Sequence, residues 1–400
     1  MKTKLLTLAA GLMTATALAT VPVKADVKIG LIGGVTGPIA AMAPAMMDAA
    51  KLVIDQVNDQ GGIGAGEKLV GVVGDSACNP QGGTDAATKA VNIEGVAGIV
   101  GPHCSGAVLA AAGSVTIPAG VVLVTPSGTS PEITGLKDNG TVFRTVPSDD
   151  YQGRALARTL KEQGYNKVAV AYLNNDYGTG LAGAFKGEFE AQGGEITQYA
   201  GHETDKASYR SNLAELAKGG ADTLVIFDYG DGTGLTILRQ ALENGFFEKF
   251  VGGDGMKSDA VINELGAENL ATFVSSSPVG EKSDSLDMFN KAFKDAGGDP
   301  DAIFANTSYD AAFMLALALE KTGGKKDGVG AALVEISNGE GEAIQPGEWK
   351  KAKEAIAAGK AIDYKGAAGD HNFDANGDVP GTYALFEVGA DGFEVITEMK

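Results

Sequence analysis

Two short loops combine glycine, proline and small hydroxyl residues in a way that could bind an anionic group. Residues 101–106 and residues 125–131 each follow a short apolar run and precede a helical pattern, and residues 34–38 repeat the arrangement. At the carboxyl ends of parallel strands, such loops expose backbone N–H groups toward a ligand. A carboxylate could bind the hydroxyls of Ser105 and Thr129 with nearby amides. The alternative is ordinary capping of the following helices, but three loops at matching positions favour a ligand.

A second set of candidate side chains follows later strand-like runs. Tyr177, Tyr229 and Asp254 each lie directly after such a run, in loops that also contain glycine. Aromatic rings at the edge of a cleft can cover an apolar ligand group, and a carboxylate can pair with an ammonium group. The alternative is that both tyrosines pack at a rim and that Asp254 is a turn residue.

Catalytic chemistry is poorly supported by the residues available. The chain contains three histidines, His103, His202 and His371, and no Gly-x-Ser-x-Gly elbow. His103 is two residues from Ser105 on a tight loop that cannot easily aim both side chains inward. We therefore expect a protein that is not an enzyme.

Cofactor and metal sites are also not expected. Residues 33–37 lack the G-x-G-x-x-G spacing of a dinucleotide site, and Pro38 does not suit such a loop. Residues 374–378 resemble the first half of a calcium loop, but the glycine is misplaced and the distal glutamate is missing. A hairpin turn is the better interpretation of that segment.

The elements that must position these side chains alternate between apolar runs of strand length and helical patterns. Because the runs are apolar throughout, we expect strands buried on both faces of parallel sheets. The pattern restarts near residue 146, and residues 273–277 form a predicted return strand. The last forty residues have an antiparallel pattern, and residues 340–347 are expected to form a polar surface loop. The predicted strands are residues 27–33, 69–74, 98–100, 121–124, 167–173, 196–201, 223–227, 250–252, 273–277, 383–388 and 393–396.

The first 25 residues have the features of a signal peptide. Lys2 and Lys4 precede an apolar run at residues 5–18, and residues 23–25 have the small-x-small pattern of a cleavage site. We expect cleavage after Ala25 and a periplasmic protein. The remaining chain is long enough for two domains. Its strong acidity, a formal charge of −19 for the whole chain, argues against nucleic acid as a partner.

The chain has two cysteines, Cys78 and Cys104. Free thiols and a metal site with two sulfur ligands are the alternatives to a disulfide. A disulfide is favoured because an exported chain folds in an oxidising compartment.

These features together resemble the leucine/isoleucine/valine-binding protein family, the periplasmic solute-binding proteins of branched-chain amino-acid ABC transporters. The resemblance extends from Val27 to about Val388. The segments that carry it are residues 29–38, 58–63, 75–80, 101–105, 125–132, 176–180 and 238–241.

The resemblance implies an α/β chain with a type I periplasmic binding fold, in which two doubly wound lobes are joined by three crossover strands. Lobe 1 would comprise residues 26–146 and 278–364, and lobe 2 residues 147–277 and 365–400. It also implies the disulfide between Cys78 and Cys104, hinge closure on the ligand, and a membrane permease of an ABC transporter as partner. A monomer is expected, without cofactors.

The family's ligand contacts can be carried over to matching positions. Ser105 and Thr129 would hold the ligand carboxylate. The carbonyl of Ser127, the hydroxyl of Thr129 and the carboxylate of Asp254 would hold the ammonium group. Further contacts expected from the family are Gly128 in the same loop, Tyr177 and Tyr229 in the second lobe, and Met42 and Phe304 around the ligand side chain.

Three departures from the family affect the identity of the ligand. The acid at position 254 is aspartate rather than glutamate, and Met42 replaces an aromatic residue. A segment of about twenty residues near 340–360, which includes Trp349, resembles an insertion. An amide, an aromatic acid or another small carboxylate therefore remains an alternative ligand, and a sensor role remains an alternative to transport.

Overall fold

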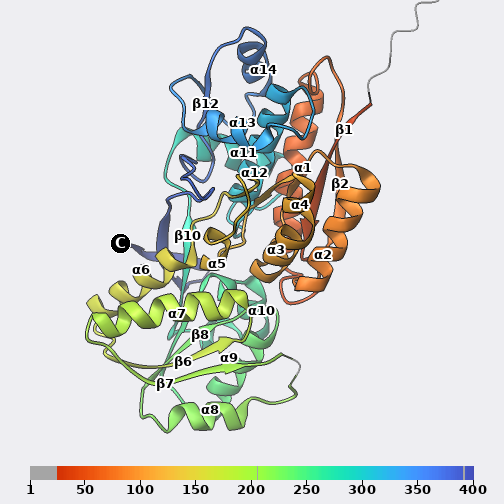
Figure 1. Ribbon diagram of the computed structural model, residues 1–400. Coiled ribbons are helices and arrows are strands. Elements are labelled where there is room, and N and C mark those ends of the chain that lie inside the picture. The colour runs from red at the N-terminus through yellow and green to blue at the C-terminus, as the bar shows by residue number, and fades with distance from the viewer. Residues whose placement is uncertain (1–24, 205, 391) are drawn as a thin grey trace, which may run out of the picture.

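The computed structural model describes residues 25–204, 206–390 and 392–400. Figure 1 shows two lobes, each built on a β-sheet with helices on its faces, so the predicted α/β class and two-lobed type I fold are confirmed. The predicted signal peptide lies outside the described residues, apart from Ala25 at its cleavage site. Among the described residues, no helix is both long and apolar enough to cross a membrane.

The sheet of lobe 1 has five strands in the order β2-β1-β3-β4-β5, and all neighbours are parallel. Its central strands are almost wholly buried, which explains their uninterrupted apolar sequence. The strands are β1 (Val27–Gly33), β2 (Leu69–Asp75), β3 (Gly98–Val100), β4 (Val122–Thr125) and β5 (Val142–Arg144).

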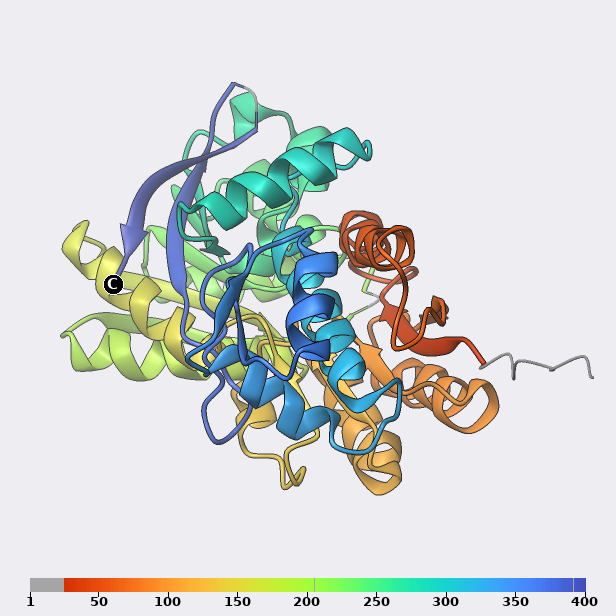
Figure 2. The same ribbon diagram turned by 90° about the horizontal axis from the view of Figure 1, so that it is seen from above.

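Helices from both halves of the chain cover this sheet. In Figure 2, α1 lies beside the later helices of the same lobe. The helices are α1 (Ala43–Asp59), α2 (Pro80–Thr88), α3 (Ser105–Ala111), α4 (Ile117–Ala119), α5 (Pro131–Thr134), α11 (Asp284–Asp295), α12 (Ala305–Thr322), α13 (Val329–Ser337) and α14 (Trp349–Ala357). Helix α12 is buried along most of its length, so the chain returns from lobe 2 to complete the core of lobe 1.

The sheet of lobe 2 has seven strands in the order β14-β13-β10-β9-β8-β6-β7. The β10–β13 and β13–β14 pairs are antiparallel and the other pairs are parallel. The strands are β6 (Lys167–Leu173), β7 (Glu195–His202), β8 (Thr223–Phe227), β9 (Lys249–Gly252), β10 (Phe273–Val279), β13 (Thr382–Val388) and β14 (Phe393–Met399). The helices are α6 (Asp149–Glu162), α7 (Asp176–Ala191), α8 (Arg210–Ala217), α9 (Thr233–Asn244) and α10 (Asp259–Leu265).

Residues 340–347, predicted as a polar surface loop, contain a short strand, and the segment near 340–360 has regular secondary structure. It forms β11 (Glu342–Ile344), α14 and β12 (Ile362–Tyr364), with β11 and β12 paired in parallel. Trp349 is fully buried in the core of lobe 1 and donates its indole N–H to the carbonyl of Gly62 at 3.3 Å. The apolar face of α14 therefore makes this segment part of the core.

The segment at 374–378 is a turn, but it is not the predicted hairpin turn. The amide of Asp374 donates to the carbonyl of Asp378 at 2.9 Å, but β12, which precedes the turn, and β13, which follows it, belong to different sheets. The hairpin forms later, between β13 and β14. Asp378 is held in lobe 1 because it pairs with the buried guanidinium of Arg144.

Three segments connect the lobes, as the fold type requires. They follow β5, β10 and the turn at 374–378. Ala367, Phe373 and Val379 lie in the hydrophobic core of lobe 1. The third crossing therefore lies near residue 380, although the sequence placed the start of the last lobe 2 segment at residue 365.

Candidate ligand-binding site between the lobes

The loops after β3 and β4 are joined to each other by hydrogen bonds. Thr125 Oγ1 donates to the carbonyl of Pro102 at 2.6 Å and accepts from the amide of Gly128 at 2.9 Å. Ser127 Oγ donates to the carbonyl of His103 at 2.8 Å. A Cβ at Gly128 would lie 2.8 Å from both Thr125 Oγ1 and Val108 Cγ2, so this position has no room for a larger residue. The two loops form one rigid unit.

Ser105 connects this unit to helix α3. Its Oγ accepts from the amide of Thr129 at 3.2 Å and from the amide of Ser130 at 3.1 Å. The hydroxyl hydrogen of Ser105 can still be donated, which suits a carboxylate. The sequence prediction treated Ser105, Ser127 and Thr129 as one group, and the structure brings them together.

Arg144, at the end of β5, holds the loop after β4 in place and was missed by sequence reasoning. Its fully buried guanidinium donates to the carbonyls of Thr129 and Ser130, both at 3.0 Å, to the hydroxyl of Thr134, and to both carboxylate oxygens of Asp378. All five N–H groups of the side chain are therefore used. The only sequence signal was a charged residue at the end of an apolar strand.

The candidate residues of lobe 2 also form a connected group. Tyr177 donates its hydroxyl to Asp254 Oδ1 at 2.6 Å, and the amide of Gly255 donates to the Tyr177 hydroxyl at 3.0 Å. The rings of Tyr177 and Tyr229 stack with centroids 5.0 Å apart. Asp254 is buried at the start of the 3-10 turn Asp254–Met256, directly after β9.

The electrostatics of this group follow from its burial. Burial raises the pKa of Asp254, although hydrogen bonds from Tyr177 and Gln152 oppose this effect. Burial and the charge of Asp254 raise the pKa of Tyr177 well above its usual value, so its hydroxyl remains a donor. A cation beside Asp254 would stabilise its ionised form.

Met42 and Phe304 contribute the apolar wall between the lobes. Both are buried in one hydrophobic cluster that also contains Tyr177 and Tyr229. Met42 precedes α1 and Phe304 precedes α12, so two helices of lobe 1 position them. Phe304 also lines a cavity of about 250 Å³ at the crossover segments, together with Thr145, Pro278 and Pro380.

Asp149 and Gln152, on the first turns of α6, are further polar residues at the boundary that sequence reasoning missed. Both are fully buried, and Gln152 Nε2 donates to Asp254 Oδ1 at 3.3 Å and to Ser276 Oγ at 3.0 Å. The amide of Asp149 donates to the carbonyl of Thr129 in lobe 1 at 2.9 Å. Asp149 follows Ser148, the N-cap of α6, so its sequence resembles an ordinary helix start.

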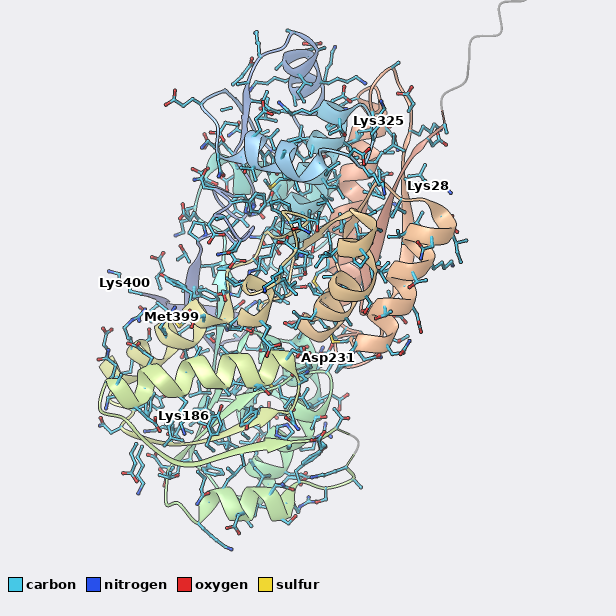
Figure 3. The ribbon with its side chains drawn as sticks, viewed as in Figure 1. Lys28, Lys186, Asp231, Lys325, Met399 and Lys400 are labelled. Carbon is cyan, nitrogen blue, oxygen red and sulfur yellow. A yellow bond between two sulfur atoms is a disulfide. The ribbon has the colours of Figure 1, made fainter. Side chains whose placement is uncertain are left out.

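The lobes are in contact across the cleft in this structure. The amide of Ala41 in lobe 1 donates to Asp231 Oδ2 in lobe 2 at 2.9 Å, and Figure 3 shows Asp231 where the lobes meet. Glycines permit close approach: a Cβ at Gly180 on α7 would lie 2.7 Å from Pro131 Cδ, and one at Gly106 would lie 2.6 Å from Asp176 Oδ2. The conformation is therefore a closed one.

A disulfide joins Cys78 and Cys104, whose Cα atoms are 5.3 Å apart. It connects the loop after β2 to the residue that precedes α3. It therefore stabilises the loop that carries Ser105.

The histidines are held in structural positions. His202 Nε2 lies 2.7 Å from Asp228 Oδ2, and His371 Nε2 lies 2.7 Å from Asp310 Oδ2, with both pairs buried. Burial lowers the pKa of His103 to about 4, so this side chain is neutral at physiological pH. Among the described residues, no three His, Cys, Asp or Glu side chains are grouped closely enough to hold a metal ion.

Comparison with known proteins agrees with this architecture. Residues 45–391 match the family described as receptor family ligand binding region. The leucine-, isoleucine-, valine-, threonine- and alanine-binding protein of Pseudomonas aeruginosa is 32% identical over 301 residues, which cover 74% of this chain and 79% of that protein. The Leu/Ile/Val-binding protein homolog 1 of Brucella melitensis is 30% identical over 375 residues, which cover 92% of each chain. These relatives are binding proteins by name, not enzymes.

Solved structures share the fold at lower identity. The leucine-binding protein of Thermotoga maritima superposes with a TM-score of 0.79 at 23% identity, covering 94% of this chain and 99% of that one. A solute-binding protein from R. palustris, solved with benzoate, has a TM-score of 0.76 at 19% identity and covers 93% and 96%. The family match, the relatives at 32% and 30% identity and the shared two-lobed fold together show that the chain belongs to the leucine/isoleucine/valine-binding protein family of ABC-transporter solute-binding proteins.

Proposed function

We propose that this protein binds a small α-amino acid, branched-chain or similar, between its lobes and delivers it to the permease of an ABC transporter. The observation that carries the proposal is that each lobe presents one polar group to the cleft, and that these two groups complement the two charges of an α-amino acid. Lobe 1 presents the hydroxyl-rich unit of Ser105, Ser127 and Thr129, and lobe 2 presents the buried carboxylate of Asp254. An α-amino acid carries the two charges that match them.

Binding would follow a hinge mechanism. In an open form, lobe 1 binds the ligand carboxylate through Ser105 and Thr129. Closure then brings Tyr177, Tyr229 and Asp254 over the ligand and excludes water. Met42 and Phe304 would contact the apolar side chain of the ligand. Ligand binding shifts the population toward the closed form, which is the form that docks on the permease.

The location and assembly follow from the same proposal. The basic and apolar start of the chain, with cleavage after Ala25, supports export to the periplasm. The disulfide between Cys78 and Cys104 suits that compartment. The protein would act as a monomer, without a cofactor and without catalysing a reaction.

The alternative ligand is an amide or an aromatic or other small carboxylate. It is favoured by one observation: the R. palustris protein solved with benzoate has the same fold. A deaminated acid would leave the buried carboxylate of Asp254 without a cation, which costs free energy. A sensor with the same ligand remains a second alternative to transport.

A thermal-shift screen of the mature protein tests the proposal. The panel contains L-leucine, L-isoleucine, L-valine, L-alanine and L-threonine, with 4-methyl-2-oxopentanoate and benzoate as ligands that lack the amino group. A micromolar ligand at millimolar concentration should stabilise the protein by about 4 kcal/mol. We expect stabilisation by at least one amino acid and none by the two acids that lack an amino group. Stabilisation by these two acids alone would contradict the proposal and favour the alternative.

A further inference from the structure

The turn before α1 contains one amide whose acceptor comes from the other lobe. The amides of the other residues from 40 to 43 donate to carbonyls within the same turn. The amide of Ala41 donates instead to Asp231 Oδ2 at 2.9 Å. The backbones approach closely beside this bond, since a Cβ at Gly232 would lie 3.0 Å from the Cβ of Pro38. The Ala41 amide therefore has this acceptor only while the lobes are in contact.

Helix α1 does not supply a negative side chain at its own start. Met42, at the N-cap position, makes no side-chain hydrogen bond to the helix, and the first turn contains no aspartate or glutamate. The first amides of a helix need acceptors, and the helix dipole favours a negative charge beside them. In the closed form, the carboxylate of Asp231 supplies from lobe 2 the charge that the first turn of α1 lacks.

The carboxylate of Asp231 is oriented within lobe 2. Its other oxygen, Oδ1, accepts from the hydroxyl of Ser258, and Ser258 Oγ also accepts from the amide of Ala260 as the N-cap of α10. These three residues belong to the same lobe, so their hydrogen bonds do not depend on closure. The side chain of Asp231 therefore loses little conformational freedom when it meets lobe 1.

Both ends of this contact are next to expected ligand contacts. Met42 directly follows Ala41, and Tyr229 is two residues before Asp231. The side chains of Met42 and Tyr229 are buried in the same hydrophobic cluster between the lobes. The bond between Ala41 and Asp231 therefore joins the two loops that would enclose the apolar part of a ligand.

We propose that Asp231 is a positioning residue that retains the bound ligand. It stabilises the closed form by accepting the Ala41 amide and does not touch the ligand itself. This inference rests on the proposed function, because closure around an amino acid is the state that the contact retains. A contact that forms after the ligand has entered acts on release and not on the encounter.

The test compares Asp231→Ala and Asp231→Asn with Asp259→Ala. Asparagine keeps an acceptor oxygen but loses the charge. Asp259 is an exposed carboxylate of the same lobe, on the first turn of α10, so its removal makes the same change in net charge away from the contact. The melting temperature of the ligand-free protein establishes that each variant is folded.

The ligand is the one of L-leucine, L-isoleucine, L-valine, L-alanine and L-threonine that wild type binds best, in radiolabelled form. Rapid filtration after mixing gives the association rate. Dilution of the complex into an excess of the unlabelled amino acid gives the release rate.

We expect Asp231→Ala to release the amino acid about fivefold faster than wild type, as the loss of one partly exposed hydrogen bond predicts, and to change the association rate less than about twofold. Asp231→Asn should release it at an intermediate rate, and Asp259→Ala should match wild type. The melting temperature of the ligand-free protein should be the same in all four proteins, because the contact belongs to the closed form.

A wild-type release rate in Asp231→Ala would overturn this role of Asp231 and leave the proposed function intact. The same holds for an effect confined to the association rate, or for an equal effect in Asp259→Ala, which would indicate net charge rather than the contact with Ala41. Failure of wild type to bind any of the five amino acids would overturn the proposed function and this inference with it.

Discussion

In the proposed site, Asp254 is the side chain on which the choice of ligand most depends. The family position carries glutamate, and aspartate has a reach one methylene shorter. In this structure the shorter carboxylate is held from two sides, by the Tyr177 hydroxyl at 2.6 Å and the Gln152 amide at 3.3 Å. The carboxylate is therefore preorganised, which reduces the cost of ordering it on binding.

Removal of this carboxylate should weaken amino-acid binding strongly. We expect Asp254→Ala to cost about 2–5 kcal/mol of binding free energy, because a buried ammonium group would lose its counter-charge. Calorimetric titration of the variant with the best amino acid from the screen measures the change. Asp259→Ala is the control, since Asp259 is exposed on the first turn of α10 nearby. Equal affinities of wild type and Asp254→Ala would exclude Asp254 from the site.

The loop between β4 and α5 is a unit that depends on strand β5. Arg144 lies at the end of β5 and connects the carbonyls of Thr129 and Ser130 to Asp378, which lies 234 residues further along the chain. The third crossover segment follows Asp378 directly. One buried ion pair therefore links the loop after β4 to the third crossover segment.

Breaking this pair should destabilise lobe 1. Arg144→Met keeps the length of the side chain but leaves Asp378 without its counter-charge and removes the guanidinium donors from the carbonyls of Thr129 and Ser130. Removing one partner of a buried pair typically costs about 3–5 kcal/mol. Urea denaturation followed by circular dichroism measures the change, with Arg154→Met as the control, because the Arg154–Asp150 pair is solvent-exposed. A stability loss below that of the control would mean that Asp378 and the carbonyls find other donors.

The segment β11-α14-β12 is an integral part of the core of lobe 1. Trp349 is the only tryptophan of the chain, and its ring meets Phe313 of α12 edge-on with centroids 6.1 Å apart. The segment contacts the sheet-covering helices rather than the cleft. It therefore affects stability more than the choice of ligand.

Truncation of this tryptophan should separate stability from binding. We expect Trp349→Ala to lower the free energy of unfolding by about 3–5 kcal/mol, as large core deletions do. Affinity for the ligand should remain unchanged, because Trp349 does not lie at the lobe boundary. Denaturation and calorimetry on the same preparation give both values. A stability loss below 1 kcal/mol would contradict the burial of this ring, and a loss of affinity would place the segment in the binding mechanism.

Glycines lie where helices of the two lobes meet in the closed form. Gly180 of α7 faces Pro131 at the start of α5, and a Cβ there would be only 2.7 Å from the proline ring. Gly183, three residues further along α7, has no atom within 4 Å of a Cβ. The two positions therefore offer a matched comparison of blocked and unblocked closure.

A side chain at the interface should keep the lobes apart. We expect Gly180→Leu to weaken binding at least about tenfold, because the population that can close is reduced. Small-angle scattering should show that ligand no longer reduces the radius of gyration of this variant. Gly183→Leu adds the same side chain on the same helix and should behave as wild type. Compaction of Gly180→Leu by ligand would show that the interface adjusts and that closure does not need this glycine.

The local sequence alone determined the bounds of several strands and the fold class. The strands 27–33, 98–100, 167–173 and 223–227 were predicted with the bounds that the structure has, because each is an apolar run between turn residues. The pattern of alternating strands and helices predicted parallel α/β sheets with a boundary near residue 146, and the resemblance to the family added the two-lobed type I fold. The departure of Asp254 from the family's glutamate was also visible without coordinates.

Only the tertiary structure decided how distant residues combine. Asp149 and Gln152 have the sequence of an ordinary helix start, and they reach the cleft because α6 follows the first crossover directly. Arg144 finds Asp378 across 234 residues, and Trp349 finds Gly62 across 287. Such partners depend on how the lobes pack and on which polar groups are left without water. Both depend on contacts between residues far apart in the chain, which cannot be predicted from a local pattern of residues.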